Sequence, residues 1–446
     1  MIVVKFGGSS VANAKQIEKV ANIIKADKNR KFVVVSAPGK RYDDDEKVTD
    51  LLIKLGEAFV NNKSYEHIYR TILNRFKEVI DGLKLDNGLL TNIEQSLKDA
   101  LNVITADNLD QLLALGEDSS AKVVSAYLNK IGLPSIYVNP LNAGIIVSDH
   151  PGNAQILPNS YEKIYKLRKN DEIVVIPGFF GYTEDGKLVT FSRGGSDITG
   201  SIIAAGVKAK LYENFTDVDS VYSVNPQFVK NPKKIRTLTY KEMRELSYAG
   251  FSVFHDEALI PAFEAKIPVC IKNTNNPSAP GTMIVAHKEP TARCVVGIAS
   301  DTGFCSIYVS KYLMNREVGF GRRLLHILED ENVSFEHMPS GIDDITIIMR
   351  ENQLTAAKET RIMNRIKEEL DVDTIRMVHD LAVIMVVGEG MQQTIGMAHK
   401  ATEALANARV NLEMINQGSS EVSMMFGIKT EDLTRAIPSL YKAYFE

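Results

Sequence analysis

Apolar runs and amphipathic segments alternate along the first part of the chain. Short runs rich in β-branched residues predict buried strands, and these lie at Val3–Phe6, Phe32–Val35, Ser135–Val138, Ile173–Ile176, Lys187–Phe191, Lys210–Phe215 and Pro268–Lys272. Between them, apolar residues recur at helical spacing around Ile17–Ile24, over Leu109–Leu133 and through Ile202–Ala205. Strands that alternate with helices predict an α/β fold, with a mostly parallel sheet covered by helices on both faces.

A different pattern begins near residue 299, after the polar segment Lys288–Ala292 with its Pro290. Strand, loop, helix, strand, strand and helix follow one another, and then the order repeats. The expected strands are Cys305–Val309, Phe335–His337, Ile345–Met349, Leu381–Val387, Leu412–Asn416 and Glu421–Gly427, and the expected helices are Phe320–Asp330, Thr355–Leu370, Thr394–Ala408 and Glu431–Tyr444. The repetition predicts two copies of a small α+β module.

The composition narrows the classes of protein that the chain could be. Its 446 residues are enough for more than one buried core, and 44% hydrophobic and 24% charged residues are ordinary for a soluble globular protein. A net charge of −4 argues against a broad nucleic-acid surface, and no apolar run reaches the length of a membrane span. Without a signal-peptide pattern, we expect a cytoplasmic protein. Three widely spaced cysteines indicate reduced thiols, not disulfides or zinc ligands.

Glycine-rich turns follow two of the predicted strands, and ligands bind at such strand ends in open α/β sheets. In Lys5–Ser9, two glycines would let backbone N–H groups approach a phosphate, while the lysine on the strand reaches it as a point charge. The segment could also be a plain tight turn, because it lacks the Gly-Lys-Ser/Thr ending of a P-loop. Ser36–Gly39 is equally compatible with an ordinary turn.

Charged residues mark further candidate positions. Arg193–Asp197 joins an arginine and two glycines to a helix start, which suits recognition of a carboxylate or phosphate, although its Ser or Asp could be only a helix cap. Thr216–Asp219 fits nucleotide or Mg²⁺ contacts, or an Asx turn. Thr49 and Glu117 could bind a ligand or stabilise helix starts. The acidic run Asp43–Glu46 could hold Mg²⁺, but such a run is more typical of a solvated loop.

Taken in order, these segments resemble the aspartokinase family of amino-acid kinases over the whole chain. The likeness is carried by KFGGSSV, SAPGK, KVTDLL, GED, FSRGGSDITGS, NFTDVD and YSVNP. The tandem repeat resembles a pair of ACT domains and includes the loop VGEGM. A lysine-regulated subgroup of the Bacillus/Clostridium type is indicated by GFSVFHDEALIPAF, IKNTNNPSA and HMPSGIDD.

The resemblance implies a fold and an activity. It implies an amino-acid kinase (carbamate kinase-like) domain over residues 1–298 and ACT domains over 299–376 and 377–446, which could exchange strands or helices. It implies ATP-dependent phosphorylation of the β-carboxylate of L-aspartate to 4-phospho-L-aspartate, the first step of lysine, threonine and methionine biosynthesis. Because the sequence ends with the second module, we expect a monofunctional kinase and no fused dehydrogenase.

The resemblance also assigns roles to residues of this sequence. It gives catalytic roles to Lys5 and Asp197. The implied ATP-binding residues are Lys5, Phe6, Gly7, Gly8, Thr216, Asp217 and Tyr222. The implied substrate-binding residues are Thr49, Glu117, Arg193 and Ser196. No metal ligand is assigned on the protein, and Mg²⁺ would arrive with ATP. Two departures stand out: Gln227 replaces an arginine and Ser252 replaces a nucleotide-contacting lysine of many members. Another residue would supply the lost charge, or ATP would bind more weakly.

The charges fit an amino-acid substrate. Arg193 could bind an α-carboxylate, while Glu117 and Asp197 could face the ammonium group. An aspartate side chain has an ordinary pKa of about 3.9, so it attacks phosphorus without a general base. The enzyme would instead align two anions and neutralise the transferred phosphoryl group. A catalytically silent amino-acid sensor and a kinase of glutamate or another acid remain alternatives; only Gln227 and Ser252 favour the sensor.

The repeat could be only a dimerisation appendage, or it could also sense an effector. The resemblance places an effector site at Met314, Gly319, Ser334, Phe335 and Glu336, where Glu336 could pair with an ammonium group. Lysine is the expected effector, with threonine acting beside it as an alternative. We expect a homodimer or homotetramer assembled through these modules, and a bound amino acid that shifts an equilibrium between active and inactive states.

Overall fold

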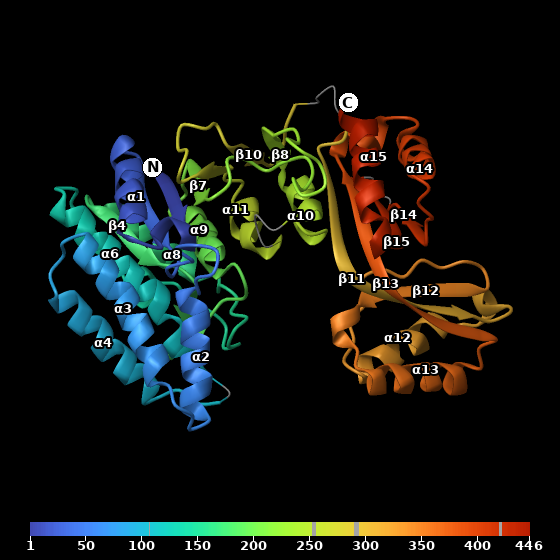
Figure 1. The fold of residues 1–446 in the computed structure, drawn as a ribbon, viewed down its shortest axis with the longest axis horizontal. Coiled ribbons are helices and arrows are strands. Elements are labelled where there is room, and N and C mark those ends of the chain that lie inside the picture. Colours follow the sequence, from blue (N-terminus) through green and yellow to red (C-terminus); the bar gives the residue numbers. More distant parts are fainter. Residues whose placement is uncertain (107, 252–255, 290–293, 419–421) are drawn as a thin grey trace. The chain divides into compact units, whose positions relative to one another are not determined.

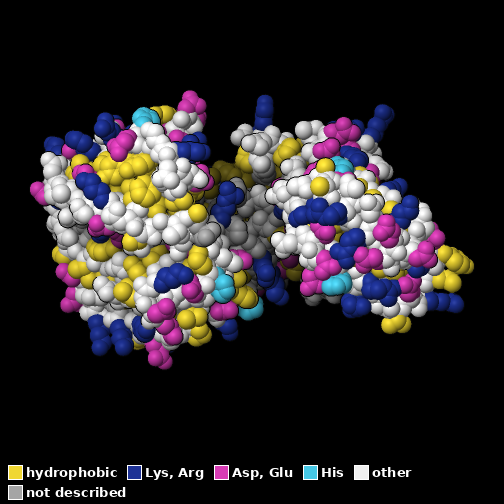
Figure 2. Space-filling model, turned by 90° about the horizontal axis from the view of Figure 1, so that it is seen from below, with side chains coloured by type: hydrophobic (Ala, Val, Ile, Leu, Met, Phe, Trp, Pro, Cys, Tyr) yellow, Lys and Arg dark blue, Asp and Glu magenta, His cyan; other side chains and the backbone are white. Residues whose placement is uncertain are grey.

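The computed structural model describes residues 1–106, 108–251, 256–289, 294–418 and 422–446, which divide into two compact units (Figure 1). The first unit consists of Met1–Val221, Lys234–Met243 and Ser252–Glu289. The second consists of Tyr222–Lys233, Arg244–Phe251 and Pro290–Glu446. Two short segments from the first part of the sequence therefore pack with the second unit, which local periodicity could not reveal. Charged side chains of both signs are interspersed over the face shown in Figure 2.

An eight-stranded sheet forms the centre of the first unit, in the order β3-β4-β2-β1-β7-β9-β10-β8. Neighbouring strands are parallel except β9 and β10, which confirms the predicted mostly parallel sheet. The strands are β1 Ile2–Phe6, β2 Arg30–Val35, β3 Ser135–Tyr137, β4 Ile173–Pro177, β7 Leu211–Thr216, β8 Thr237–Thr239, β9 Val269–Asn273 and β10 Thr282–Val285. β1 lies between β2 and β7, and its residues Val3–Phe6 are buried on both faces of the sheet, Lys5 included.

Helices occupy the connections between these strands (Figure 1). They are α1 Ala14–Ala26, α2 Val48–Val60, α3 Glu66–Gly82, α4 Gly88–Leu101, α5 Asp110–Leu113, α6 Leu115–Lys130, α7 Pro140–Ala143, α8 Ser160–Tyr165, α9 Gly195–Gly206, α10 Tyr240–Tyr248 and α11 Ile260–Glu264. The expected long helix over Leu109–Leu133 is in fact two helices, α5 and α6. Among the described residues, no helix is both long enough and apolar enough to span a bilayer.

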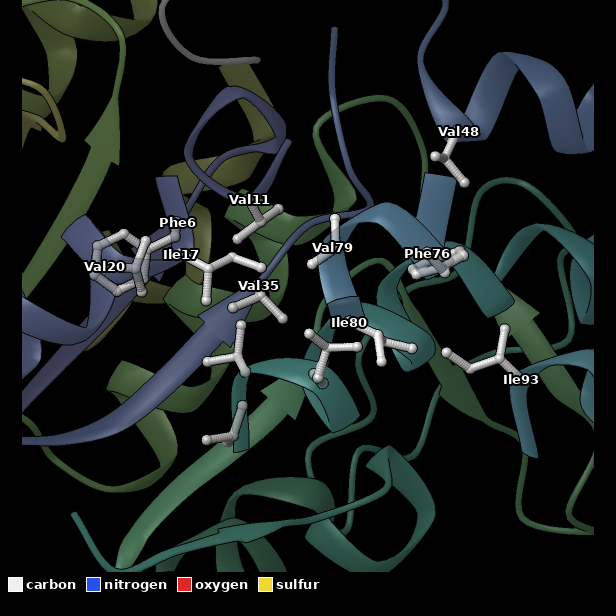
Figure 3. Close-up of a cluster of buried hydrophobic side chains, with 14 of the residues drawn as sticks. Phe6, Val11, Ile17, Val20, Val35, Val48, Phe76, Val79, Ile80 and Ile93 are labelled. Carbon is white, nitrogen blue, oxygen red and sulfur yellow. The ribbon is translucent and has the colours of Figure 1, made fainter. Parts of the chain in front are cut away.

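An apolar core of the first unit lies between the sheet and α1, α3 and α6 (Figure 3). Phe6 and Val35 come from neighbouring strands, Ile17 and Val20 from α1, and Phe76 from α3. The two residues of α1 are three apart, so they lie on one face of the helix, as the sequence pattern predicted. Val4 and Phe6 of β1 face this core, so Val3 and Lys5 point to the opposite face of the sheet.

The second unit is built on one five-stranded antiparallel sheet in the order β12-β11-β13-β15-β14. Its strands are β11 Gly297–Ser310, β12 Asp344–Arg350, β13 Thr374–Val387, β14 Met414–Asn416 and β15 Ser423–Lys429, and its helices are α12 Phe320–Asp330, α13 Ala356–Leu370, α14 Met397–Asn407 and α15 Leu433–Phe445. Two separate apolar cores lie against this sheet, one around α12 and α13 and one around α14 and α15. These cores correspond to the two predicted modules.

The two modules share their longest strands. β11 and β13 have 14 residues each and pair from Gly297↔Val387 to Ser310↔Thr374. The first half of β11 therefore lies in the core with α14 and α15, whereas its second half lies in the core with α12 and α13. Residues 299 and 377, where the sequence placed module limits, fall inside these shared strands.

Two expected strands differ in the structure. Lys187–Phe191 is represented by β6 Leu188–Thr190, which pairs with β5 Phe180–Tyr182 in a separate hairpin outside the large sheet. The two strands are joined by a short turn, so local pairing prevails over the large sheet. Phe335–His337 forms no strand, and only His337 makes an isolated bridge, to Ile348. Pro339 follows closely and cannot donate to a ladder.

Candidate active site

A glycine loop follows β1 at the centre of the sheet. Gly7 N donates to Phe215 O at 3.0 Å, and a Cβ added to Gly7 would lie 3.5 Å from Lys5 Nζ. A Cβ added to Gly8 would lie 2.9 Å from Ala37 O, which is closer than side chains pack. Glycine is therefore required at position 8, where the loops after β1 and β2 touch, and the Lys5 ammonium lies beside the loop.

The residues after this loop form a 3-10 turn, Gly8–Val11, and α1 begins only at Ala14. Asn13 caps α1 by accepting a hydrogen bond from Gln16 N at 3.0 Å. N–H groups available to an anion at the loop would therefore come from the loop and the 3-10 turn, and not from the first turn of α1.

Strand alternation points Lys5 toward α9. Val4 and Phe6 belong to the apolar core on the side of α1, so the side chain between them points to the opposite face of β1. There Lys5 Nζ lies 2.6 Å from Asp197 Oδ1, and both side chains are largely buried. An unpaired buried ammonium would cost several kcal/mol, so the ion pair ties the start of α9 to β1. The structure thus brings the two predicted catalytic residues together.

Two residues of β7 complete the surroundings of Asp197. Asn214 Nδ2 donates to Asp197 Oδ1 at 2.6 Å, and Tyr212 OH donates to the Asp197 main-chain oxygen at 3.3 Å. Asn214 is the first residue of the NFTDVD segment, but the sequence assigned no role to it or to Tyr212. Their position follows only from the parallel pairing of β7 with β1, which joins segments more than two hundred residues apart.

Glu117 lies in the first turn of α6 and is only 4% exposed. Ser196 Oγ donates to its Oε1 at 3.5 Å, whereas its Oε2 has no hydrogen-bond partner among the described residues. Burial raises the pKa of Glu117 to about 8, so much of this carboxyl is protonated at pH 7. The free protein thus holds Glu117 mostly neutral, and a cation bound beside it would favour the charged form.

The other predicted substrate-binding residues lie on loops and helix starts. Arg193 follows the hairpin strand β6, is exposed, and forms no ion pair with any described residue. Gly194 has a φ of 81° and begins α9, so only glycine fits there without strain. Thr49 is the second residue of α2, whose N-cap is Lys47, so it is not the helix cap that we considered. Because Arg193 is exposed and has no ion-pair partner among the described residues, its guanidinium is free to bind an anion.

Thr216 and Asp217 end β7, next to the glycine loop that follows β1. Thr216 Oγ1 donates to Asp217 Oδ1 at 3.1 Å, and Asn273 Nδ2 donates to the Asp217 main-chain oxygen at 3.2 Å. Tyr222 is also expected to contact the nucleotide, but it packs with the second unit. It is therefore not part of the compact unit that contains Thr216 and Asp217. Ser252 lies outside the described residues.

One residue of the acidic run, Asp45, is engaged by arginines. Asp45 is buried, with Arg41 Nε at 2.9 Å and Arg75 Nη1 at 3.0 Å from its Oδ2. Arg75 also donates to Gly39 O at 2.6 Å, so the network braces the loop that contacts Gly8. Throughout the described ranges, no cluster of three His, Cys, Asp or Glu residues is arranged to hold a metal ion.

The predicted effector residues lie in the second unit but do not all share one surface. Ser334 and Phe335 line a hollow of about 850 Å³ beside α12. Glu336 is turned to internal partners, because it accepts a hydrogen bond from Tyr248 OH and its Oε1 lies 3.5 Å from Arg350 Nε. Gly319, with a φ of 83°, begins α12, and Met314 is buried in a 3-10 turn before it.

Comparisons with known proteins agree with the fold of the chain. The profile of the amino acid kinase family matches residues 1–273, and an ACT domain profile matches residues 384–444. The chain is 55% identical to aspartokinase 3 of Bacillus subtilis, covering 100% of this chain and 99% of the relative. It superposes on the aspartate kinase of Clostridium acetobutylicum with a TM-score of 0.88 at 39% identity, covering both chains fully. Aspartokinase III of Escherichia coli, solved with aspartate and ADP, shares the fold with a TM-score of 0.82 at 24% identity, again over 100% of both chains.

The raised pKa of Glu117 predicts a pH-dependent effect on stability. Between the ordinary pKa of 4.5 and about 8, the folded state keeps a proton that the unfolded state has lost, so this group lowers stability as the pH rises. Glu117→Gln cannot titrate, so its melting temperature relative to wild type should increase from pH 5 to pH 8. The exposed Glu57→Gln is the control. A difference that stays constant over this range would contradict the prediction.

Proposed function

This chain belongs to the aspartokinase family, and from that membership we propose how its residues act on aspartate and ATP. The chain is an aspartate kinase, which transfers a phosphoryl group from ATP to the carboxylate of its amino-acid substrate. One observation carries the assignment of residues: a buried Lys5–Asp197 ion pair lies beside a glycine loop at the centre of the sheet.

We place the ATP phosphates at the glycine loop. Lys5 would neutralise phosphoryl oxygens, and the backbone at Phe6, Gly7 and Gly8 would approach them without side-chain hindrance. Thr216 and Asp217, at the end of the neighbouring strand β7, would contact the rest of the nucleotide, with Tyr222 as a further contact. This assignment does not need the arginine and lysine that Gln227 and Ser252 replace, because the Lys5 ammonium is already positioned at the loop.

Mg²⁺ would be bound mainly through the phosphates. Such an ion keeps several waters and takes one or two protein ligands beside phosphate. The exposed carboxylate of Asp217 is the available ligand at the end of β7. When bound, the ion adds neutralisation of negative charge on the phosphates.

We place aspartate between Arg193, Glu117 and Asp197. Arg193 has no partner among the described residues and would bind the α-carboxylate. The ammonium group would face Glu117 and Asp197, and it would draw the proton off Glu117 by favouring the ionised form. Ser196 and Thr49 supply hydroxyls for the remaining polar atoms. The unpartnered Oε2 of Glu117 supports this placement, because a buried polar atom usually has a partner.

The chemistry is then electrostatic. The β-carboxylate of aspartate is ionised at neutral pH and is itself the nucleophile, so no residue must remove a proton. The site has to hold two anions in line and offset the charge of the transferred group, which Lys5 and the loop N–H groups can do. Because Glu117, Arg193, Asp197 and Lys5 are all present, a catalytically silent sensor is disfavoured.

We propose that lysine regulates this activity through the second unit, which would also assemble a homodimer or homotetramer. An effector ammonium at Glu336 would compete with Tyr248 and Arg350, so its binding would rearrange contacts of the segment Arg244–Phe251. Threonine acting with lysine is the second candidate. The effector would thus bind more tightly to the state in which Glu336 has left Tyr248 and Arg350. A difference in affinity between two states is what lets a ligand shift their populations.

Lys5→Ala should lower kcat by about 10²-fold or more at saturating aspartate and ATP, because one charge-stabilising donor is typically worth that much. Steady-state kinetics would measure the loss, with glutamate in place of aspartate to test substrate class. Lys15→Ala, on the exposed face of α1, is the matched control and should behave as wild type. Near-normal turnover of Lys5→Ala would remove Lys5 from phosphoryl transfer.

Arg193→Ala should raise the KM for aspartate by about tenfold or more, since a bidentate contact to the α-carboxylate is lost. The KM for ATP should change little. Arg193→Lys should recover only part of the affinity, because an ammonium cannot bind a carboxylate in the same planar way. Equal increases in both KM values would instead place Arg193 on the phosphates.

Lysine should inhibit the enzyme at millimolar or lower concentration, and Glu336→Gln should raise the half-inhibitory concentration by about tenfold or more, since it removes the charge that faces the effector ammonium. Glu331→Gln, in the same module, is the matched control. Inhibition assays with lysine, threonine and methionine would identify the effector. If none of the three inhibits at millimolar levels, the regulatory proposal is wrong.

A further inference from the structure

Asn214 occupies the position on β7 that pairs directly with Lys5 on β1. The register is Lys5↔Asn214, and neighbouring residues of a parallel pair point to the same face of the sheet. Phe215, next along β7, belongs to the apolar core on the opposite face, which confirms the direction of Asn214. The amide is buried, and an amide in the middle of a central strand must find polar partners.

Both side chains reach the same oxygen of Asp197. Asp197 Oδ1 accepts from Lys5 Nζ at 2.6 Å and from Asn214 Nδ2 at 2.6 Å. An ionised carboxylate can only accept, so the NH₂ end of the amide must face it. Asn214 Nδ2 also lies 3.4 Å from Tyr212 OH, which itself donates to the Asp197 main chain. The amide is therefore held from two sides and has little freedom to turn away.

We propose that Asn214 is a positioning residue for phosphoryl transfer, an inference that rests on the roles assigned above to Lys5 and Asp197. A lysine ammonium has three donors and a flexible stem, so it can turn from Asp197 toward a phosphoryl oxygen. Asn214 would then keep Asp197 Oδ1 hydrogen-bonded and fixed in place. Without the amide, Lys5 would be the only side-chain donor to Asp197 Oδ1 among the described residues, and the carboxylate would hold the ammonium back.

The first test removes the donor at nearly constant volume. Asn214→Leu should lower kcat by about 10- to 100-fold, the scale on which small misplacement of reacting groups slows a reaction. The KM values for aspartate and ATP should stay within about twofold of wild type, because the amide contacts neither substrate. Asn129→Leu, which loses hydrogen bonds between α6 and Ser135, is the control and should keep the wild-type kcat.

The second test replaces the donor by an acceptor of the same shape. Asn214→Asp places a carboxylate against Asp197, and two carboxylates at this distance cannot both ionise. The charged and titratable groups facing the new side chain are Lys5 from β1, Asp197 from α9 and Tyr212 from β7. A proton shared by the pair restores the hydrogen bond, so kcat of this variant relative to wild type should rise several-fold from pH 8 to pH 6. A simply destabilised fold would not produce this dependence.

The outcomes separate the explanations. A kcat of Asn214→Leu within twofold of wild type, or an Asn214→Asp to wild-type ratio that is flat with pH, would overturn the positioning role. A rise of both KM values in step with a lower melting temperature would also overturn it, in favour of a structural role. Wild type is assayed in the same series with aspartate and ATP. If the assigned activity itself is wrong, wild type will also be inactive, whereas a failure of the positioning role leaves wild type active.

Discussion

A buried ammonium in the central strand is the constraint on which the first unit depends. Lys5 stands where its neighbours Val4 and Phe6 are fully buried, and a cation there must have an anion against it. Asp197 supplies that anion only if α9 begins at the right place, and Gly194 in the left-handed conformation allows this start. The ion pair thus connects the loop after β1, the loop after the hairpin and the first turn of α9. The stability of the fold and the proposed chemistry both require Lys5 and Asp197 to lie side by side.

Local sequence patterns predicted the elements well because strands and helices have short periods. The alternation of apolar runs gave the parallel sheet, and glycines next to charged residues identified Lys5, Gly8 and Asp197 before any coordinates. The hairpin containing β6 was not predicted, because a short apolar run does not specify which strand it pairs with. Asn214 opens the NFTDVD segment, but its role was missed for the same reason: its neighbour Lys5 is distant in sequence, and only register brings them together.

Charge states were harder to predict than positions. From the sequence, Glu117 is an acid with an ordinary pKa, but burial of its side chain at the start of α6 raises that pKa and favours the neutral form in the free protein. The acidic run gave the opposite result, because Asp45 is held in its charged form by two arginines. These arginines lie outside any recognised motif. Both cases depend on solvent exclusion and on distant partners. The sequence therefore indicates which residues could form a site, but it does not determine whether they are protonated or already paired with other residues.

The shared strands of the second unit have a consequence for how that unit can unfold. β11 and β13 each run through both apolar cores, so neither module can separate without breaking main-chain hydrogen bonds that belong also to the other. The two repeats should therefore form a single cooperative folding unit, with hydrogen exchange protected to a similar degree in both halves. A molecule that stabilises one half would then slow opening in the other half as well. The two modules would then behave as one thermodynamic unit.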